Sequence, residues 1–259
     1  MEEKKALIGM SGGVDSSVAA YLMLKTGYSC IGATMRLFDS ADAESTCCSL
    51  DDVEDARSVA RRLGIPHYVF NFKDDFEEQV IRKFVACYEQ GATPNPCIDC
   101  NRHLKFDRLL RRAMELGCDY VVSGHYAQIR QDETTGRYLL YKAADKAKDQ
   151  TYFLACLDQQ QLAHIRFPLG GLTKTEVRAI AEQNGFVNAR KHDSQDICFV
   201  PDGDYVAFME RYTGKQYPAG DFLDTDGNVV GRHRGAVCYT LGQRKGLGLA
   251  MGAPGYGCG

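Results

Sequence analysis

The chain has 259 residues, of which 44% are hydrophobic and 25% charged, so it can bury a core in one large domain or in two unequal ones. Its formal net charge of −3 argues against a protein that holds nucleic acid through its overall field, so an RNA partner would need a local basic face. No stretch approaches the roughly 18 apolar residues of a membrane span. We therefore expect a cytoplasmic protein without a membrane partner.

Strands and helices alternate along the first 150 residues. Apolar runs and helical spacing predict strands over 6–10, 30–35, 67–72 and 119–123, and helices over 18–25, 50–63, 75–88 and 102–116. This alternation predicts an α/β fold with a doubly wound parallel sheet, with ligands at the carboxyl ends of its strands. The stretch 91–100 carries two prolines, which predicts a shaped loop rather than a helix.

The pattern changes after the predicted hairpin, whose strands are 126–130 and 137–141. Helices are predicted near 159–165, 174–184 and 204–213, and strands over 220–224, 229–233 and 236–240. We expect a nucleotide-binding domain over 1–150, a helical segment packed on it over 151–213, and a small β domain over 214–259.

Residues 11–17, with the sequence Ser-Gly-Gly-Val-Asp-Ser-Ser, separate the first strand from the first helix. Gly12 and Gly13 can take positive φ, so backbone N–H groups and serine hydroxyls can surround an anion at the helix N-terminus. Asp15 fits beside a phosphate if it orients a donor or holds Mg²⁺. The alternative is a glycine-rich turn with no ligand.

The chain contains eleven cysteines, which in a reducing cytosol are not expected to form disulfides. The spacing of Cys97 and Cys100 suits a metal, an iron–sulfur cluster or a redox disulfide, although two unrelated loop cysteines would look the same. A helix that begins beside Cys100 would lower the pKa of its thiol. Judged by its neighbours alone, Cys198 is a core cysteine.

Several sequence words occur in a fixed order: Ser-Gly-Gly-Val-Asp-Ser at 11–16, Thr-Pro-Asn-Pro at 93–96, Gly-His-Tyr at 124–126, Lys-Asp-Gln at 148–150, Phe-Pro-Leu-Gly at 167–170, Ile-Cys-Phe at 197–199, and Tyr-Thr-Leu-Gly-Gln-Arg-Lys-Gly at 239–246. The first word resembles the pyrophosphate loop of the ATP pyrophosphatases. The whole chain resembles the tRNA-specific 2-thiouridylase family, which thiolates the wobble uridine (U34) of certain tRNAs at C2.

The resemblance implies an adenine nucleotide alpha hydrolase-like fold and an ATP- and Mg²⁺-dependent reaction that adenylates the uridine and releases pyrophosphate. The residues that it assigns to ATP are Gly9, Met10, Ser11, Gly12, Gly13, Val14, Asp15, Ser16, Met35 and Gly124. It also implies that family members continue into a final barrel domain that is absent from this sequence.

The resemblance also assigns the tRNA and sulfur sites. The target base would contact Asn95, Pro96 and Cys97, and the remaining tRNA contacts would be His125, Lys148, Asp149 and Gln150. Cys198 would carry a persulfide received from a sulfur donor, and the partner expected besides tRNA is a sulfur-donor protein or a sulfide source. Cys100 would help to release that sulfur onto C2.

Two questions stay open at this point. Many family members have an acidic residue where this chain has Cys97, so a general base at that position is in doubt. Cys97, Cys100 and Cys198 could instead hold a [4Fe-4S] cluster, as in related tRNA-thiolating enzymes. The rival functions are another adenylating synthetase with the same nucleotide loop and a non-catalytic metal-binding tRNA-binding module; the oligomeric state is not indicated.

Overall fold

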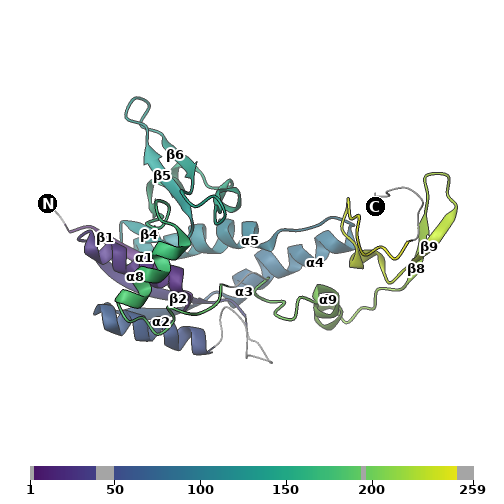
Figure 1. Cartoon of the computed structure of the whole chain (residues 1–259), viewed down its shortest axis with the longest axis horizontal. Helices are drawn as coiled ribbons and strands as arrows, with labels where there is room; N and C mark the ends of the chain where they lie inside the picture. Colours follow the sequence, from purple (N-terminus) through teal and green to yellow (C-terminus); the bar gives the residue numbers. More distant parts are fainter. Residues whose placement is uncertain (1–2, 39–49, 194–196, 250–259) are drawn as a thin grey trace.

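The computed structural model describes residues 3–38, 50–193 and 197–249. Its centre is a five-stranded parallel sheet with the strand order β3-β2-β1-β4-β7 (Figure 1). The strands are β1 (Lys5–Gly9), β2 (Ser29–Arg36), β3 (His67–Asn71), β4 (Tyr120–Val122) and β7 (Ile165–Arg166). The predicted parallel sheet is therefore confirmed. Strand β7 was not predicted, because two residues are too few to show strand alternation.

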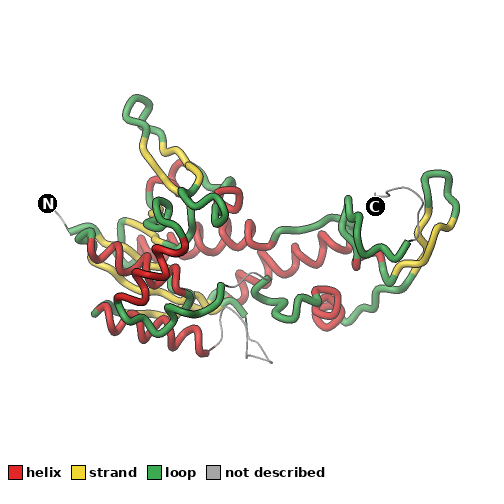
Figure 2. Tube along the Cα trace, viewed as in Figure 1, coloured by secondary structure: helices red, strands yellow, loops and turns green. Residues whose placement is uncertain are grey.

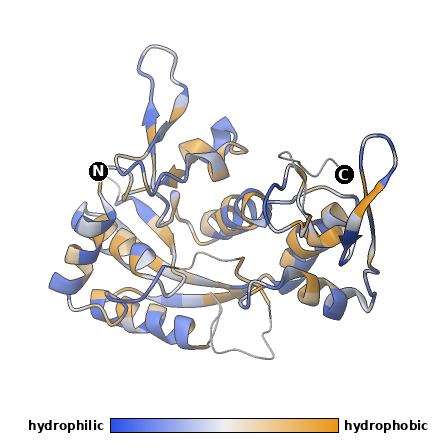
Figure 3. Cartoon of the chain, turned by 45° about the vertical axis from the view of Figure 1, so that its right-hand side comes forward, coloured by the Kyte–Doolittle hydropathy of each residue, from blue (hydrophilic) through white to orange (hydrophobic). Residues whose placement is uncertain are grey.

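Helices cover both faces of this sheet. On one face, α1 (Val14–Lys25), α2 (Leu50–Leu63) and α8 (Lys174–Gln183) share a hydrophobic cluster with Ile8 of β1. Leu7, the preceding residue of β1, belongs to a second cluster on the other face. Successive strand side chains point to opposite faces, so this single strand supplies both cores. In Figure 3 the flanking helices carry both hydrophilic and hydrophobic residues, as one-sided burial requires.

Two long helical stretches build the second face. The first joins α3 (Lys73–Phe76), a π-helical segment η1 (Glu77–Ile81) and α4 (Arg82–Glu89). The second joins α5 (Pro96–Asp99), a π-helical segment η2 (Cys100–Arg108) and α6 (Leu109–Glu115). The prediction that 91–100 forms a loop without helix was wrong for its second half, because 96–100 are helical. Pro96 is the first helical residue, where its missing N–H costs nothing, and the Asn95 side chain caps the helix by accepting from Cys97 N at 3.2 Å.

The remaining elements lie outside the sheet. The hairpin of β5 (Ala127–Gln131) and β6 (Tyr138–Lys142) projects from it, as Figure 2 shows, and is followed by η3 (Thr151–Leu154) and α7 (Gln159–Ala163). At the far end of the elongated molecule lie α9 (Tyr205–Thr213) and the hairpin of β8 (Gly220–Leu223) and β9 (Val229–His233). No helix among the described residues is both long and apolar enough to span a bilayer.

The strand predicted over 236–240 was wrong. Ala236–Cys238 forms a 3₁₀ turn, η4, and does not extend the β8–β9 ladder. The Val237 side chain is buried, and the Val237 carbonyl accepts a hydrogen bond from the Tyr205 hydroxyl of α9 at 3.0 Å. The hydrogen bond from Tyr205 thus takes the place of the backbone hydrogen bond that a neighbouring strand would have formed with Val237.

Gly170 and Gly171 provide a matched test of the packing between the hairpin and the sheet. A Cβ on Gly170 would lie 2.6 Å from the carbonyl carbon of Ala127, whereas a Cβ on Gly171 would meet nothing within 4 Å. We expect Gly170→Ala to lower the free energy of unfolding by about 1–3 kcal/mol, because backbone cannot yield as a side chain can. Gly171→Ala should stay within about 0.5 kcal/mol of wild type in the same urea titration. Equal effects would show that the close approach is not rigid.

Candidate functional site

The glycine loop lies at the carboxyl end of β1, the central strand. Gly12 has φ of 76°, and a Cβ there would lie 2.7 Å from the Asp52 Cα, so the loop requires glycine at this position. Gly13, which was also expected to use positive φ, instead has φ of −85° and is the N-cap residue of α1. The loop thus delivers the chain to the N-terminus of a twelve-residue helix, where anions are favoured.

Serine hydroxyls brace the loop from within. Ser16 Oγ accepts from Ser11 N at 3.2 Å and donates to the Gly13 carbonyl at 3.0 Å. Ser17 Oγ donates to the same carbonyl at 3.1 Å, and Asn188 Nδ2 donates to the Gly12 carbonyl at 2.8 Å. The loop is therefore held in its turn by its own hydroxyls and by a residue 176 positions away.

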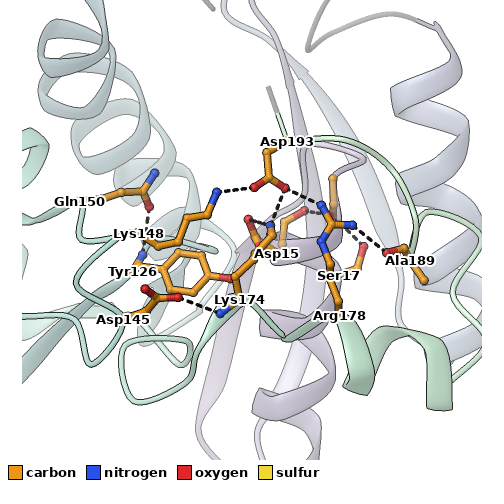
Figure 4. Close-up of polar contacts among 12 residues, drawn as sticks. Asp15, Ser17, Tyr126, Asp145, Lys148, Gln150, Lys174, Arg178, Ala189 and Asp193 are labelled. Atoms are coloured by element: carbon orange, nitrogen blue, oxygen red, sulfur yellow. Dashed lines mark hydrogen bonds and ion pairs between the residues drawn. The ribbon is translucent and has the colours of Figure 1, made fainter. Parts of the chain in front are cut away.

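Asp15, in the first turn of α1, is held by two groups from later in the chain. Lys174 Nζ lies 2.7 and 2.8 Å from its two carboxylate oxygens, and the Tyr126 hydroxyl donates to Oδ1 at 2.9 Å (Figure 4). Of the two roles expected for Asp15, this geometry matches the orientation of a donor. The donor is the ammonium group of Lys174, whose side chain is only 12% exposed.

Three basic side chains converge on Asp193, and we call Lys148, Lys174 and Arg178 the cation cluster. Their nitrogens lie 2.7, 2.7 and 3.0 Å from the Asp193 carboxylate. In Figure 4, Lys148 and Arg178 reach Asp193 from opposite sides. Burial alone would raise the pKa of Asp193, but hydrogen bonds and charge from Lys148 and Lys174 lower it to about 2. Asp193 is therefore ionised throughout the physiological range.

The other residues assigned to ATP lie around the loop. A Cβ on Gly124 would stand 2.8 Å from Asp15 C and Ser16 N, so the end of β4 touches the loop backbone. Met10 continues β1 by accepting from Thr34 Oγ1 at 2.7 Å, which places Met35, the next residue of β2, at the same end of the sheet. Gly9 is the last residue of β1, and Val14 is the first of α1.

His125 is buried in the core beside Phe106 and Phe167, with ring centroids 5.7 and 5.8 Å from theirs. Burial, with the nearby Lys105 charge, holds the pKa of His125 well below its usual range. His125 Nδ1 forms a 2.8 Å hydrogen bond with the Ser123 hydroxyl. This neutral imidazole is packed as a structural histidine.

Asp149 and Gln150 hold the base of the β5–β6 hairpin. Asp149 Oδ1 accepts from Ala143 N at 2.8 Å and from Thr151 Oγ1 at 2.6 Å. Gln150 Oε1 accepts from Tyr126 N at 3.0 Å. Lys148, the residue before Asp149, is a member of the cation cluster.

The three cysteines of the sequence analysis differ in environment. Cys97 is exposed in α5, Cys100 is buried at the start of η2, and Cys198 is half-buried against the hydrophobic cluster that contains Cys100. Burial raises the pKa of the Cys100 thiol, with Lys105 opposing it, so the expectation of a lowered pKa was wrong. Over residues 3–38, 50–193 and 197–249, no three His, Cys, Asp or Glu side chains group as a metal site, so the structure does not support the cluster.

We expect Cys97 to react with iodoacetamide at pH 8 at least about ten times faster than Cys100, because a buried thiol with a raised pKa offers little thiolate. Mass spectrometry of the two modified sites over time measures both rates in one sample. Unfolding in urea should bring the two rates together. A native Cys100 that reacts as fast as Cys97 would contradict the buried placement.

Lys174 and Arg178 are the site residues that sequence reasoning missed. Thr173 and Glu176 form a capping box, which sets Lys174 at the first position of α8. Residues four apart share one helix face, so Arg178 points the same way as Lys174. The capping box and the spacing were readable from the sequence. The partners Asp15 and Asp193 were not, because tertiary packing brings them together.

A parallel sheet whose central strand ends in a glycine loop at a helix N-terminus, beside a group of basic side chains, defines an anion-binding α/β protein of the nucleotide-binding type. Residues 4–202 match the family described as tRNA methyl transferase HUP domain, and residues 206–258 match the tRNA methyl transferase PRC-barrel domain. The chain belongs to the tRNA-specific 2-thiouridylase family.

Two relatives illustrate the match. The tRNA-specific 2-thiouridylase MnmA of Acetivibrio thermocellus is 53% identical, with 99% of this chain and 73% of the relative covered. The protein of the same name from Clostridioides difficile is also 53% identical, with 97% and 70% covered. Among solved structures, NMN synthetase from Francisella tularensis is similar over 83% of this chain and 79% of its own, at 20% identity and a TM-score of 0.46.

Proposed function

We propose that this chain is a tRNA-uridine 2-sulfurtransferase, which uses ATP to replace O2 of the wobble uridine (U34) with sulfur. The observation that best supports this function is the glycine loop with the cation cluster beside it, in a chain that belongs to the 2-thiouridylase family. The loop suits the β- and γ-phosphates of ATP as a leaving group. We place the enzyme in the cytosol, where its tRNA substrate and thiol reductants occur.

In the first step, the uridine O2 attacks the α-phosphorus of ATP. A bond forms between O2 and the α-phosphorus, and the bond from that phosphorus to the bridging oxygen breaks, so that pyrophosphate leaves. Residues 9–16, Met35 and Gly124 surround the nucleotide in this proposal, and Lys174 stabilises the charge that develops on the pyrophosphate. Adenylation turns O2 into part of a good leaving group, AMP.

In the second step, the terminal sulfur of a Cys198 persulfide bonds to C2, and the bond from C2 to O2 breaks with release of AMP. The Cys100 sulfur then attacks the Cys198 sulfur, a Cys100–Cys198 disulfide forms, and the thiocarbonyl remains on C2. A thiol reductant restores the two cysteines. The common hydrophobic cluster of Cys100 and Cys198 supports this pairing. Because burial raises the pKa of Cys100, its thiol must first lose a proton.

The target base is proposed to contact Asn95, Pro96 and Cys97, at the exposed beginning of α5. His125, Asp149 and Gln150 would then affect tRNA binding through the backbone that they hold. A sulfur-donor protein that carries a persulfide would load Cys198: its outer sulfur moves to the Cys198 thiol, and the donor is left with a thiol. A sulfide source would instead serve the cluster alternative. We propose that Mg²⁺ arrives with the ATP phosphates, since both Asp15 oxygens already contact Lys174.

The test incubates the purified chain with ATP, Mg²⁺, a sulfur donor that carries a persulfide, a thiol reductant and a tRNA that has U34, and measures pyrophosphate and 2-thiouridine together. A tRNA without uridine at position 34 is the control and should give neither product. Pyrophosphate exchange without tRNA would instead indicate another adenylating synthetase. Bound metal without ATP use would indicate a tRNA-binding module, and iron in an anaerobic preparation would favour the cluster over the relay.

A further inference from the structure

We propose that the cation cluster binds pyrophosphate and that Asp193 competes with pyrophosphate for it. This inference rests on the proposed function, because it takes the ATP-derived pyrophosphate as the ligand. Asp193 then sets how tightly the leaving group is held. The Asp193 carboxylate forms ion pairs with the same side-chain nitrogens of the cation cluster that a phosphate near the loop would contact.

Lys174 lies between the glycine loop and Asp193. Its ammonium bridges Asp15, in the first turn of α1, and Asp193, with distances of 2.7 Å to an oxygen of each. The first turn of α1 is also where the helix dipole and the loop N–H groups favour an anion. An anion at the loop and Asp193 are therefore within reach of the same ammonium group.

The cation cluster contains more positive charges than paired carboxylates. Within the described part of the chain, the side chains of Lys148, Lys174 and Arg178 form ion pairs with two carboxylates, those of Asp15 and Asp193. A pyrophosphate carries more charge and more acceptor oxygens than one carboxylate, and a guanidinium binds phosphate oxygens with two parallel hydrogen bonds. The cation cluster is thus suited to a phosphate. The Asp193 carboxylate is also an anion, but it pairs with these cations more weakly than a phosphate would.

Exposure makes the exchange feasible. The side chains of Lys148 and Arg178 are 35% and 33% exposed, and that of Asp193 is 21% exposed, so an anion from solvent can reach them. The backbone before Asp193 has independent anchors. Asn188 holds the loop, and Lys191 lies 2.7 and 2.6 Å from Asp52 and Asp55 of α2. Release of Asp193 leaves these anchors intact.

The experiment titrates inorganic pyrophosphate into the full chain by calorimetry, with no tRNA present. We expect Asp193→Asn to bind pyrophosphate about tenfold more tightly than wild type, and Lys174→Met to bind it at least about tenfold more weakly. Asp55→Asn is the matched control, because it removes a carboxylate from an ion pair in the same region and should leave the affinity unchanged. Thermal melts of each variant check that it is folded.

If Asp193→Asn bound pyrophosphate no more tightly than wild type, the proposed competition would be overturned. A carboxylate that only positions the cation cluster would support pyrophosphate binding and would not oppose it. An unchanged affinity in Lys174→Met would overturn the cluster as the site. The outcomes are separable from the proposed function. A chain that binds pyrophosphate as expected but makes no 2-thiouridine keeps this inference and refutes the function, whereas active thiolation with unchanged Asp193→Asn affinity refutes this inference alone.

Discussion

Replacement of Cys198 with serine is expected to abolish 2-thiouridine formation while pyrophosphate release with tRNA continues. A serine hydroxyl cannot carry a persulfide sulfur, so thiolation should fall by at least about a thousandfold, as it does when a nucleophile is removed from other enzymes. Adenylation depends on the glycine loop and should persist. Nucleoside analysis of the digested tRNA measures thiolation, and a pyrophosphate assay of the same reaction measures adenylation.

Cys238→Ser is the matched control for that variant. Cys238 and Cys198 are both half-buried, and both pack against the same hydrophobic cluster. The loss of a thiol from the cluster therefore affects both variants, and only the sulfur chemistry distinguishes them. Thiolation that survives in Cys198→Ser, or that is lost equally in Cys238→Ser, would refute the role of Cys198.

Gly12→Ala is expected to lower kcat/KM for tRNA-dependent pyrophosphate release by about a hundredfold, the effect of misplacing reacting groups by about 1 Å. The new methyl group meets the Asp52 backbone, and alanine must also adopt a φ of 76°. The loop must shift to relieve both strains, and the phosphates shift with it. Steady-state kinetics with saturating tRNA would measure the effect.

Gly27→Ala separates the two causes. Gly27 has φ of 85°, but a Cβ there would meet nothing within 4 Å. We expect a stability loss of about 1–2 kcal/mol from the left-handed backbone and no change in pyrophosphate release. Wild-type kinetics in Gly12→Ala would show that the loop tolerates a side chain and does not cradle the phosphates closely.

Much of the fold was predictable because it depends on local patterns. The helix over 50–63 and the strand over 229–233 were predicted with the bounds that the structure has, since helical spacing marks the first and a turn sequence precedes the second. The strand expected over 236–240 does not form, and the Val237 carbonyl instead accepts a hydrogen bond from the hydroxyl of Tyr205, which lies 32 residues away in the sequence. Local propensity cannot report such a partner.

The site was predictable where it depends on backbone conformation. Gly12 was identified from residue type, since few residues other than glycine adopt positive φ. Cys100 was misjudged because burial outweighed the helix N-terminus in setting its pKa, and burial is a property of the whole fold. Lys174 was not identified for the same reason: its role depends on Asp15 and Asp193, which the fold brings beside it.

The long-range contacts of the loop have a consequence for folding. The Asp15 carboxylate accepts hydrogen bonds from Tyr126 and Lys174, which lie 111 and 159 residues later. The Gly12 carbonyl accepts a hydrogen bond from Asn188, 176 residues later. Contacts of such sequence separation form late, because the intervening chain must first be ordered. On the ribosome, the first strand and glycine loop emerge early, yet they cannot acquire their ion pairs until residue 174 has been synthesised. The candidate site is therefore begun at the start of synthesis and can be completed only after residue 188, before α9 and the β8–β9 hairpin have been made.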